Sequence, residues 1–164
     1  MTEPIDVIEL LERDHRLING LVEQLDAVDD ANEIRHLYLR IVEELSSHEA
    51  VEQAVLFPAF HAAFIADGDA TLDHRTREHE ELNETLAEMS TLPPNSFAFI
   101  KRGSALLLEL KGHFSIEEET VFTRMRSGFT AEALIELGRR AIIAKAHCPA
   151  FPVAHPTHVQ QYGD

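Results

Sequence analysis

The sequence predicts an all-α protein: an up-down four-helix bundle followed by a short C-terminal fifth helix and a loose tail. Three observations indicate this fold class. Apolar residues recur in steps of three and four along most of the 164-residue chain, as they do on one face of a helix. No sustained stretch shows the apolar–polar alternation of a half-buried strand. Short turns separate the long helical segments, which places consecutive helices antiparallel.

The first two helices occupy roughly the first 65 residues. The first is expected to begin with Thr2 as N-cap and Pro4 in its first turn, and to run to about Asp29. The second is expected over about 31–65, with Pro58 kinking or interrupting it near its end. The residues expected to face the core at helical spacing are Ile8, Leu11, His15, Ile18, Val22 and Leu25 on the first helix, and Ile34, Leu37, Ile41, Leu45, His48, Glu52, Val55 and Ala59 on the second.

The remaining helices are separated by clear turn signals. Asp67-Gly68-Asp69 predicts a turn before a third helix over about 71–90, and Leu92-Pro93-Pro94-Asn95 predicts a hard break. A fourth helix is expected over about 97–127, capped by Asn95 or Ser96, and Gly128 ends it. Thr130 is expected to cap a shorter fifth helix that runs to about Ala146. The expected inward residues are Leu72, His79, Leu82, Leu86 and Met89 on the third helix, and Phe99, Leu106, Leu110, His113, Glu117 and Val121 on the fourth. We therefore expect a bundle over 1–128 and a short helix with a flexible tail over 129–164.

Composition and charge exclude several classes of function. Acidic residues outnumber basic ones 29 to 14, which gives a net charge of −15 that repels phosphate backbones and anionic lipid. Nucleic-acid and membrane partners are therefore not expected. The single cysteine, Cys148, excludes an internal disulfide framework and is typical of a reducing compartment. No basic, apolar N-terminal leader and no run of ~18 apolar residues is present, so a cytoplasmic protein is expected.

An internal repeat relates the two halves of the chain. The segment beginning His48-Glu49-Ala50-Val51-Glu52 aligns with the segment beginning His113-Phe114-Ser115-Ile116-Glu117, and both continue to an apolar residue and a phenylalanine. His48 and Glu52 correspond to His113 and Glu117 at an offset of 65, and His15 corresponds to His79 at an offset of 64. Two helix pairs therefore carry the same polar residues at the same depth, which predicts a pseudo-two-fold bundle.

These repeated polar residues lie on apolar stripes. Positions four apart on a helix share a face, so His48 projects with Glu52 and His113 projects with Glu117. Burying such groups without compensation is costly, and several of them in one layer would consume a bundle's margin of roughly 5–15 kcal/mol. A metal centre removes this cost because it uses the groups as ligands. A lone buried histidine is usually only hydrogen-bonded, but four helices repeating the placement indicate a metal site.

The donor set favours two metal ions. The predicted ligands are four histidines and two glutamates: His15, His48, His79, His113, Glu52 and Glu117. Two histidines per ion, with both carboxylates bridging, give each ion four protein donors. Room is then left for a bridging oxo or hydroxo group and an exogenous ligand. Nitrogen and carboxylate donors with open positions suit iron, with manganese or zinc less favoured.

Other candidate residues have weaker arguments. Glu49 and Glu118 adjoin predicted ligands and could swing in as extra ligands, but they are expected to be solvated helix-face acids. His74 is expected on the surface or behind the ligands, with ligation as the less favoured alternative. His36 and His61 are expected at exposed helix positions. The histidines near Cys148, which are His147, His155 and His158, fall in a Pro-containing segment typical of a flexible tail. The phenylalanines expected around the site, where they would limit water access, are Phe57, Phe60, Phe64, Phe114 and Phe122.

The sequence resembles the haemerythrin-like HHE cation-binding family over about residues 5–126. The resemblance is carried by Asp14-His15-Arg16, by His48 with Glu52 and Leu56-Phe57-Pro58, by Glu78-His79-Glu80, and by His113 with Glu117-Glu118 and Val121-Phe122. It implies a non-haem di-iron site within a four-helix bundle, with the same six residues as ligands. Family members are associated with dioxygen binding or transport, oxygen or redox sensing, iron handling, and responses to nitrosative or peroxide stress.

The chain departs from the oxygen-carrying haemerythrins in two ways. Those carriers have an additional third-helix histidine four residues from its neighbour, whereas His74 lies five residues before His79. The carriers also use an aspartate at i+5 on the fourth helix, the place of Glu118, whereas the predicted ligand here is Glu117 at i+4. The ligand set is therefore the symmetric one of four histidines and two glutamates, and simple reversible oxygen carriage does not follow.

The favoured hypothesis is a di-iron protein that binds or senses dioxygen or a related small oxidant such as peroxide or nitric oxide. This hypothesis favours a metal- and oxygen-binding protein over an enzyme and leaves the enzymatic alternative open. One alternative is a di-iron enzyme with catalase-like or nitric-oxide-reducing activity, which needs the same open centre. A second alternative is iron handling, or a helical interaction module in which the metal is structural.

Overall fold

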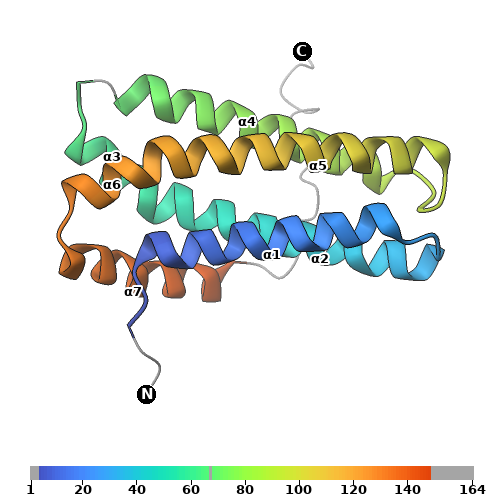
Figure 1. The fold of residues 1–164 in the computed structure, drawn as a ribbon, viewed down its shortest axis with the longest axis horizontal. Coiled ribbons are helices and arrows are strands. Elements are labelled where there is room, and N and C mark those ends of the chain that lie inside the picture. Colours follow the sequence, from blue (N-terminus) through green and yellow to red (C-terminus); the bar gives the residue numbers. More distant parts are fainter. Residues whose placement is uncertain (1–3, 67, 149–164) are drawn as a thin grey trace, which may run out of the picture.

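The computed structural model describes residues 4–66 and 68–148. It confirms the predicted all-α up-down bundle, in which consecutive long helices run in opposite directions (Figure 1). The elements in chain order are α1 (Val7–Ala27), α2 (Ala31–Val51), the π-helix η1 (Glu52–Leu56), α3 (Phe57–Ala63), α4 (Gly68–Ser90), α5 (Phe97–Glu117), the π-helix η2 (Glu118–Phe122), α6 (Thr123–Gly128) and α7 (Ala131–His147).

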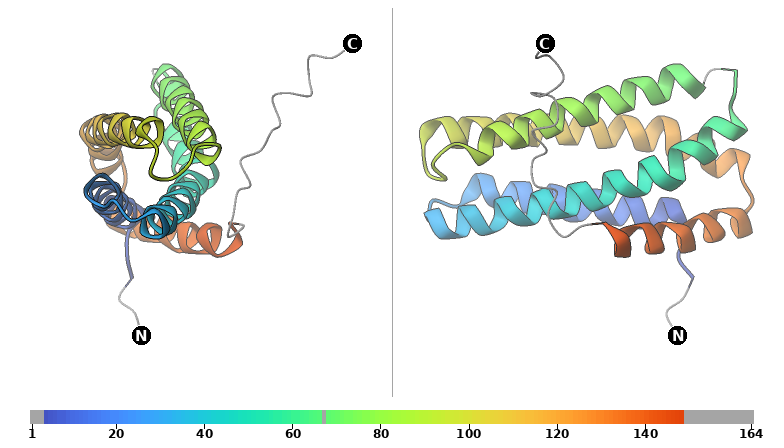
Figure 2. Two further views of the ribbon diagram at one scale, coloured as in Figure 1. Left: turned by 90° about the vertical axis from the view of Figure 1, so that its right-hand side faces the viewer. Right: turned by 180° about the vertical axis from the view of Figure 1, so that it is seen from behind.

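The long helices α1, α2, α4 and α5 surround a common interior, as the end-on view in Figure 2 shows. Helix α1 packs against α2 and α5, and α4 packs against α5. Helix α7 lies outside this bundle, where it packs against α1, α2 and η1. The predicted short fifth helix is therefore present and covers one corner of the bundle.

Several helix ends differ from the sequence-based expectation. Helix α1 begins at Val7 because the Asp6 carboxylate accepts the Glu9 backbone N–H at 2.8 Å, so the expected start near Pro4 is wrong. Helix α4 begins at Gly68, so most of the expected turn at 67–69 is helical. Thr2, Asp67 and the tail over 149–164, with His155 and His158, lie outside the described residues. Ser96 and Thr130 cap α5 and α7 as predicted.

The second helix is interrupted just before Pro58 by a π turn rather than by a break. Proline has no N–H and its ring crowds the carbonyl four residues earlier, so it disfavours a regular α-helix there. In η1 the Phe57 N–H reaches back to the Glu52 carbonyl, and α3 continues to Ala63. The fourth helix has a matching π turn, η2, where the Thr123 hydroxyl donates to the Glu118 carbonyl at 3.0 Å. Each π turn directly follows a predicted glutamate ligand or begins with it.

The interior contains two apolar clusters on either side of a polar layer. One cluster joins the start of α1, α3, η1, η2, α6 and α7 and includes Leu11, Leu56 and Phe122. The other fills the rest of the bundle and includes Ile18 and Leu110. His15 lies between Leu11 and Ile18 along α1, so the histidines and glutamates form the layer that separates the clusters.

None of the helices within the described ranges is long and apolar enough to cross a lipid bilayer.

Candidate metal centre

The structure brings all six predicted ligand residues together in the buried layer. His15 comes from α1, His48 from α2, Glu52 from η1, His79 from α4, and His113 and Glu117 from α5. Their relative exposures are His15 1%, His48 0%, Glu52 0%, His79 2%, His113 4% and Glu117 0%. The residues present two groupings that could hold a metal ion, one of His15, His48, Glu52 and Glu117 and one of Glu52, His79 and His113.

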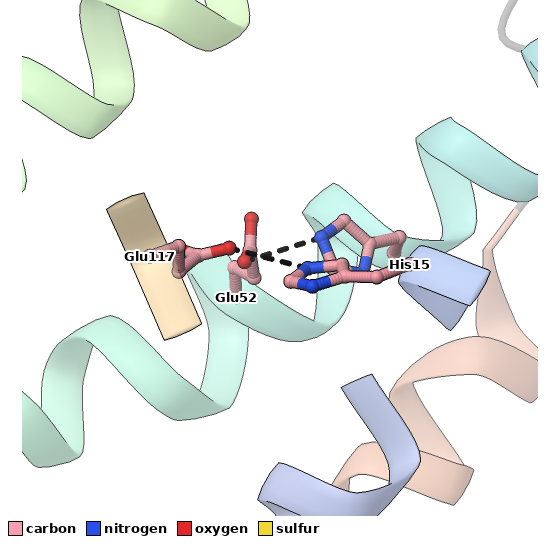
Figure 3. A group of neighbouring side chains, drawn as sticks. His15, Glu52 and Glu117 are labelled. Atoms are coloured by element: carbon pink, nitrogen blue, oxygen red, sulfur yellow. Dashed lines mark ion pairs between the residues drawn. The ribbon is translucent and has the colours of Figure 1, made fainter. Parts of the chain in front are cut away.

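The imidazole Nε2 atoms point toward the two carboxylates. Within Glu52, Oε1 lies 3.2 Å from His48 Nε2 and Oε2 lies 3.0 Å from His79 Nε2. Within Glu117, Oε2 lies 3.4 Å from His15 Nε2 and 3.9 Å from His113 Nε2. Figure 3 shows His15 facing the carboxylates of Glu52 and Glu117. Each glutamate thus faces one histidine from each half of the repeat, which is the placement that a bridging carboxylate requires.

The donor atoms fit a metal centre because they are buried without hydrogen-bond partners. The Nε2 atoms of His15, His48, His79 and His113 have no hydrogen-bond partner among the described residues, and neither do the carboxylate oxygens of Glu52 and Glu117. Buried polar atoms are almost always satisfied, so eight unsatisfied atoms in one layer need an explanation. Nitrogen and carboxylate donors of this kind are the ligands that iron, manganese and zinc accept.

The outer Nδ1 atoms of the histidines face a second set of carboxylates. His15 Nδ1 lies 2.7 Å from Glu118 Oε1, and His113 Nδ1 lies 2.7 Å from Glu78 Oε2. Behind Glu78, Arg75 Nη1 lies 2.8 Å from the same oxygen, and the Arg75 side chain is buried. A carboxylate on the outer nitrogen fixes the imidazole tautomer that leaves Nε2 free to bind a metal.

One of the two acids beside the predicted ligands differs from the sequence-based interpretation. Glu49 was expected to be solvated, but it is 6% exposed and its Oε2 accepts from the Asn83 side chain at 2.9 Å. Glu118 is exposed, as expected, and its carboxylate also contacts His15. His74 is exposed, as expected, and pairs with Glu78 at 3.3 Å. Glu118 therefore contacts a proposed ligand, whereas Glu49 is buried and held by Asn83.

Aromatic rings pack against the histidines. Phe114 stacks on His15 with ring centroids 4.0 Å apart, and Phe122 lies parallel to the same ring at 5.3 Å. Phe57 stacks on His79 at 5.8 Å. Phe57, Phe60, Phe114 and Phe122 are buried, whereas Phe64 is half-buried and packs against Phe60. The expected aromatic surroundings are therefore present, and Phe57 and Phe122 occupy equivalent places in the repeat.

Burial and mutual charge shift the pKa values of the layer in opposite directions. Burial raises the pKa of the Glu117 carboxyl well above its usual range, and the Glu52 carboxylate raises it further. Burial also opposes ionisation of Glu52, but His48 and His79 hold its pKa well below the usual range. Burial lowers the pKa of His48, yet Glu52 and Asp14 overcome this and raise it to about 9. Burial and His48 lower the pKa of His15 to about 2. The metal-free layer thus retains protons on some ligand groups, and these protons must leave when a metal binds.

The acids behind the histidines carry a signal that sequence reasoning missed. Asp14 and Glu78 each precede a predicted ligand histidine, and they are related by the same offset of 64 as His15 and His79. Asn19 and Asn83 follow those histidines by four residues and obey the same offset. Extending the repeat by one residue before each histidine therefore identifies Glu78 as part of the site. Arg75 has no counterpart at the same offset, because Leu11 occupies that position.

The chain is similar in sequence to several known proteins. Residues 6–97 match the family model for the Hemerythrin HHE cation binding domain. A DNA nickase from Nostoc sp. is 24% identical over 130 residues, which cover 79% of this chain and 36% of that protein. An uncharacterized hemerythrin-like protein from Schizosaccharomyces pombe is 22% identical over 113 residues, which cover 69% of this chain and 56% of that protein. The chain thus spans 36% and 56% of the lengths of these curated relatives.

A solved structure shares the fold. The crystal structure of a Hemerythrin HHE cation binding domain-containing protein from Mycobacterium kansasii, an Rv2633c homolog, is 20% identical in sequence. It matches with a TM-score of 0.75, and the match covers 87% of this chain and 86% of that chain.

Proposed function

Because the chain belongs to the haemerythrin HHE cation-binding family, we propose that its buried histidine and glutamate layer holds two iron ions that bind dioxygen or a related small oxidant. The observation that carries this proposal is the set of eight buried Nε2 and carboxylate oxygen atoms that have no hydrogen-bond partner in the described part of the chain. His15 and His48 would hold one ion, and His79 and His113 the other. Glu52 and Glu117 would link the two.

The donor set supports open positions at the centre. Two histidines and shared carboxylates supply fewer donors than the six that iron commonly accepts, so a small exogenous ligand has room to bind. When bound, an iron pair of this kind supplies reversible electron transfer to such a ligand. Imidazole binds a metal as a neutral ligand, so a layer rich in histidine would place less negative charge around the ions than a carboxylate-rich layer and would favour the reduced pair.

The protein's own residues exclude bulk water from this layer. Phe114 and Phe122 cover His15, and Phe57 covers His79. The carboxylates of Glu118 and Glu78 hold the outer nitrogens of His15 and His113, so these rings stay oriented toward the interior. A small neutral molecule enters such an apolar setting at less cost than a charged substrate. The ligand is therefore proposed to be a diatomic molecule or peroxide.

The nicking activity named for the Nostoc relative is not extended to this chain. The net charge of −15 repels the phosphate backbone of a nucleic acid. The chain also spans only 36% of that relative.

Anaerobic reconstitution with Fe²⁺ tests the proposal. We expect about two iron ions per chain in the unaltered protein and a loss of both in the double variant His48→Ala/His113→Ala, since each half loses a ligand. The matched control is His36→Ala, which removes an exposed histidine of α2 and should retain the full iron content. Absence of iron in the unaltered protein, or unchanged iron in the double variant, would refute the proposal.

Ligand binding and turnover can be separated by stopped-flow absorption after mixing with aerated buffer, peroxide or nitric oxide. A long-lived absorption change that reverses under argon supports a binding or sensing role. Rapid repeated turnover of peroxide or nitric oxide supports the enzymatic alternative instead.

A further inference from the structure

A lysine of the outer helix α7 reaches a buried acid of the bundle. Lys145 Nζ lies 2.6 Å from Asp14 Oδ1, and the two side chains are 24% and 11% exposed. Lys145 lies 131 residues after Asp14, so tertiary packing alone brings them together. An exposed ion pair contributes little to stability, but this pair is largely shielded from water. Its position next to the proposed metal centre suggests a role other than stability.

The second oxygen of Asp14 faces a proposed ligand. Asp14 Oδ2 lies 3.6 Å from His48 Nδ1. Both atoms are buried, and neither has a hydrogen-bond partner within residues 4–66 and 68–148. An imidazole that binds a metal through Nε2 carries its proton on Nδ1 and donates it to a carboxylate or carbonyl. Asp14 is therefore the acid placed to receive the outer N–H of His48.

The other half of the repeat also places a cation, a carboxylate and a histidine next to one another, although there a single carboxylate oxygen contacts both partners. There, Arg75 Nη1 lies 2.8 Å from Glu78 Oε2, and that oxygen lies 2.7 Å from His113 Nδ1. Glu78 and Asp14 occupy equivalent positions, one residue before His79 and His15. Arg75 is on α4 itself, three residues before Glu78, whereas the cation for Asp14 comes from a helix outside the bundle. Each half of the site thus has a cation, a carboxylate and a histidine next to one another, but the cation comes from a different helix in each half.

We propose that Lys145 is a positioning residue of the metal centre. It holds Asp14 Oδ1 so that Oδ2 faces His48 Nδ1. Helix α7 thereby supplies the cation for the half of the site that contains His48. This inference rests on the proposed function. Lys145 would contact neither the metal nor the small molecule bound to it, and would act only through Asp14 and His48.

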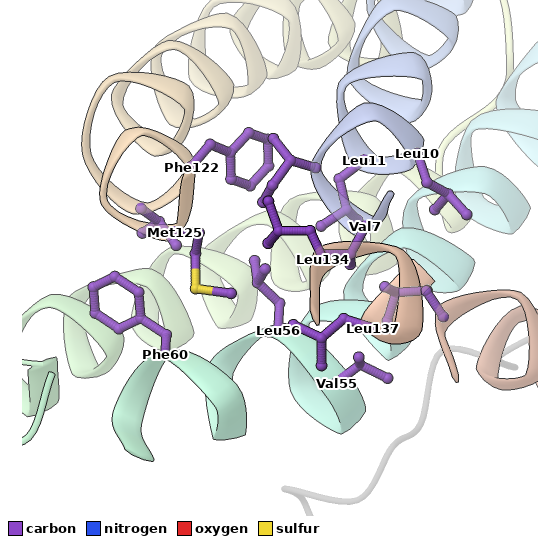
Figure 4. Packing of buried hydrophobic residues seen from close by; sticks show 14 of the residues in the cluster. Val7, Leu10, Leu11, Val55, Leu56, Phe60, Phe122, Met125, Leu134 and Leu137 are labelled. Atoms are coloured by element: carbon purple, nitrogen blue, oxygen red, sulfur yellow. The ribbon is translucent and has the colours of Figure 1, made fainter. Parts of the chain in front are cut away.

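Helix α7 is packed closely against the bundle. Leu134 and Leu137 of α7 pack into the apolar cluster with Val7 and Leu56 (Figure 4). Gly138 allows a close backbone approach, because a Cβ atom there would lie 2.1 Å from the Ile5 carbonyl oxygen. Residues 134, 138, 141 and 145 follow one another in steps of three or four and so share one face of the helix. The packing that fixes α7 therefore also places Lys145 over Asp14.

The test combines cation affinity with the state of the His48 ring. Co²⁺ affinity, measured by competition with a chelator, should fall roughly 10- to 100-fold in Asp14→Asn, the range for losing such a partner. We expect a roughly tenfold loss in Lys145→Met, recovery in Lys145→Arg, and no further loss when Lys145→Met is added to Asp14→Asn. The matched control Arg139→Met removes a positive charge from the same helix, where Arg139 pairs with Glu136 on the surface, and should leave the affinity unchanged.

Imidazole ¹⁵N–¹H correlation spectra of the metal-free protein supply a second readout. Lys145→Met should shift the His48 ring nitrogens and leave those of His113, which Glu78 holds, in place. Unchanged or tighter Co²⁺ binding in Lys145→Met, strictly additive effects in the double variant, or an unshifted His48 ring would each overturn the inference. If the unaltered protein bound no cation, the proposed function would fail, and the His48 spectra would still decide the role of Lys145.

Discussion

Replacing Glu117 with methionine should stabilise the metal-free protein and remove the stabilisation that metal provides. Glu117 is 0% exposed, and both its carboxylate oxygens lack a hydrogen-bond partner among the residues that the structure describes. Methionine has a similar length and no charge, and it adapts to irregular space in a core. The substitution therefore removes an unsatisfied buried group without leaving a large cavity.

The magnitude follows from the cost of unsatisfied burial. Leaving a buried polar group without a partner costs about 1–3 kcal/mol. For a domain of this size, 1 kcal/mol corresponds to roughly 2–4 °C in Tm. We expect Glu117→Met to raise the free energy of unfolding of the metal-free protein by about 1–3 kcal/mol. The control is Glu119→Met, which removes an exposed carboxylate two residues away and should change the stability by less than about 0.5 kcal/mol.

The gain should depend on pH in a defined direction. The pKa of Glu117 is raised in the folded protein, so the unaltered protein is relatively stable when this carboxyl is protonated and loses stability as the pH rises through its folded pKa. The advantage of Glu117→Met should therefore be small near pH 4 and larger at pH 7. Urea denaturation of metal-free samples at both pH values, followed by addition of Co²⁺, measures it. If the metal-free Glu117→Met protein were less stable than the unaltered one at pH 7, the buried Glu117 carboxyl would not be destabilising and the prediction would be wrong.

Three further outcomes can be checked. Because the pKa of His48 is about 9 in the metal-free protein, the proton on this ring must leave before a cation binds. The cost of losing this one proton should lower the cation affinity by up to tenfold for each pH unit below 9. Calorimetry in buffers of different ionisation enthalpy should detect the released proton. Arg75→Met should lower the free energy of unfolding by about 1–3 kcal/mol, because it removes the arginine that pairs with the largely buried carboxylate of Glu78. Urea denaturation measures this change, and a loss below about 0.5 kcal/mol would contradict the prediction. Gly138→Val should displace α7 and lower Tm, since its Cβ would overlap the Ile5 carbonyl oxygen; an unchanged Tm would show that the helix accommodates the side chain.

The all-α bundle and the buried layer could be predicted because both depend on short-range patterns. Apolar spacing identified the core face of α1, from Ile8 to Leu25, and that of α5 and η2, from Phe99 to Val121. The sequence repeat predicts that His48 and His113 lie at equal depth. Their role as metal ligands remains a prediction, but their burial and proximity are structural facts.

Tertiary packing decided the features that no local pattern encodes. Glu49 looks like a solvated acid in the sequence, yet packing buries it and pairs it with Asn83 on another helix. Lys145 meets Asp14 because α7 folds back over the N-terminal half of α1. Helical periodicity in the sequence indicates which face of a helix is buried. The partner of a buried polar group depends instead on which distant segment packs against that face. Burial can therefore be read along the chain, and the charge environment of the buried groups is set only when the helices assemble.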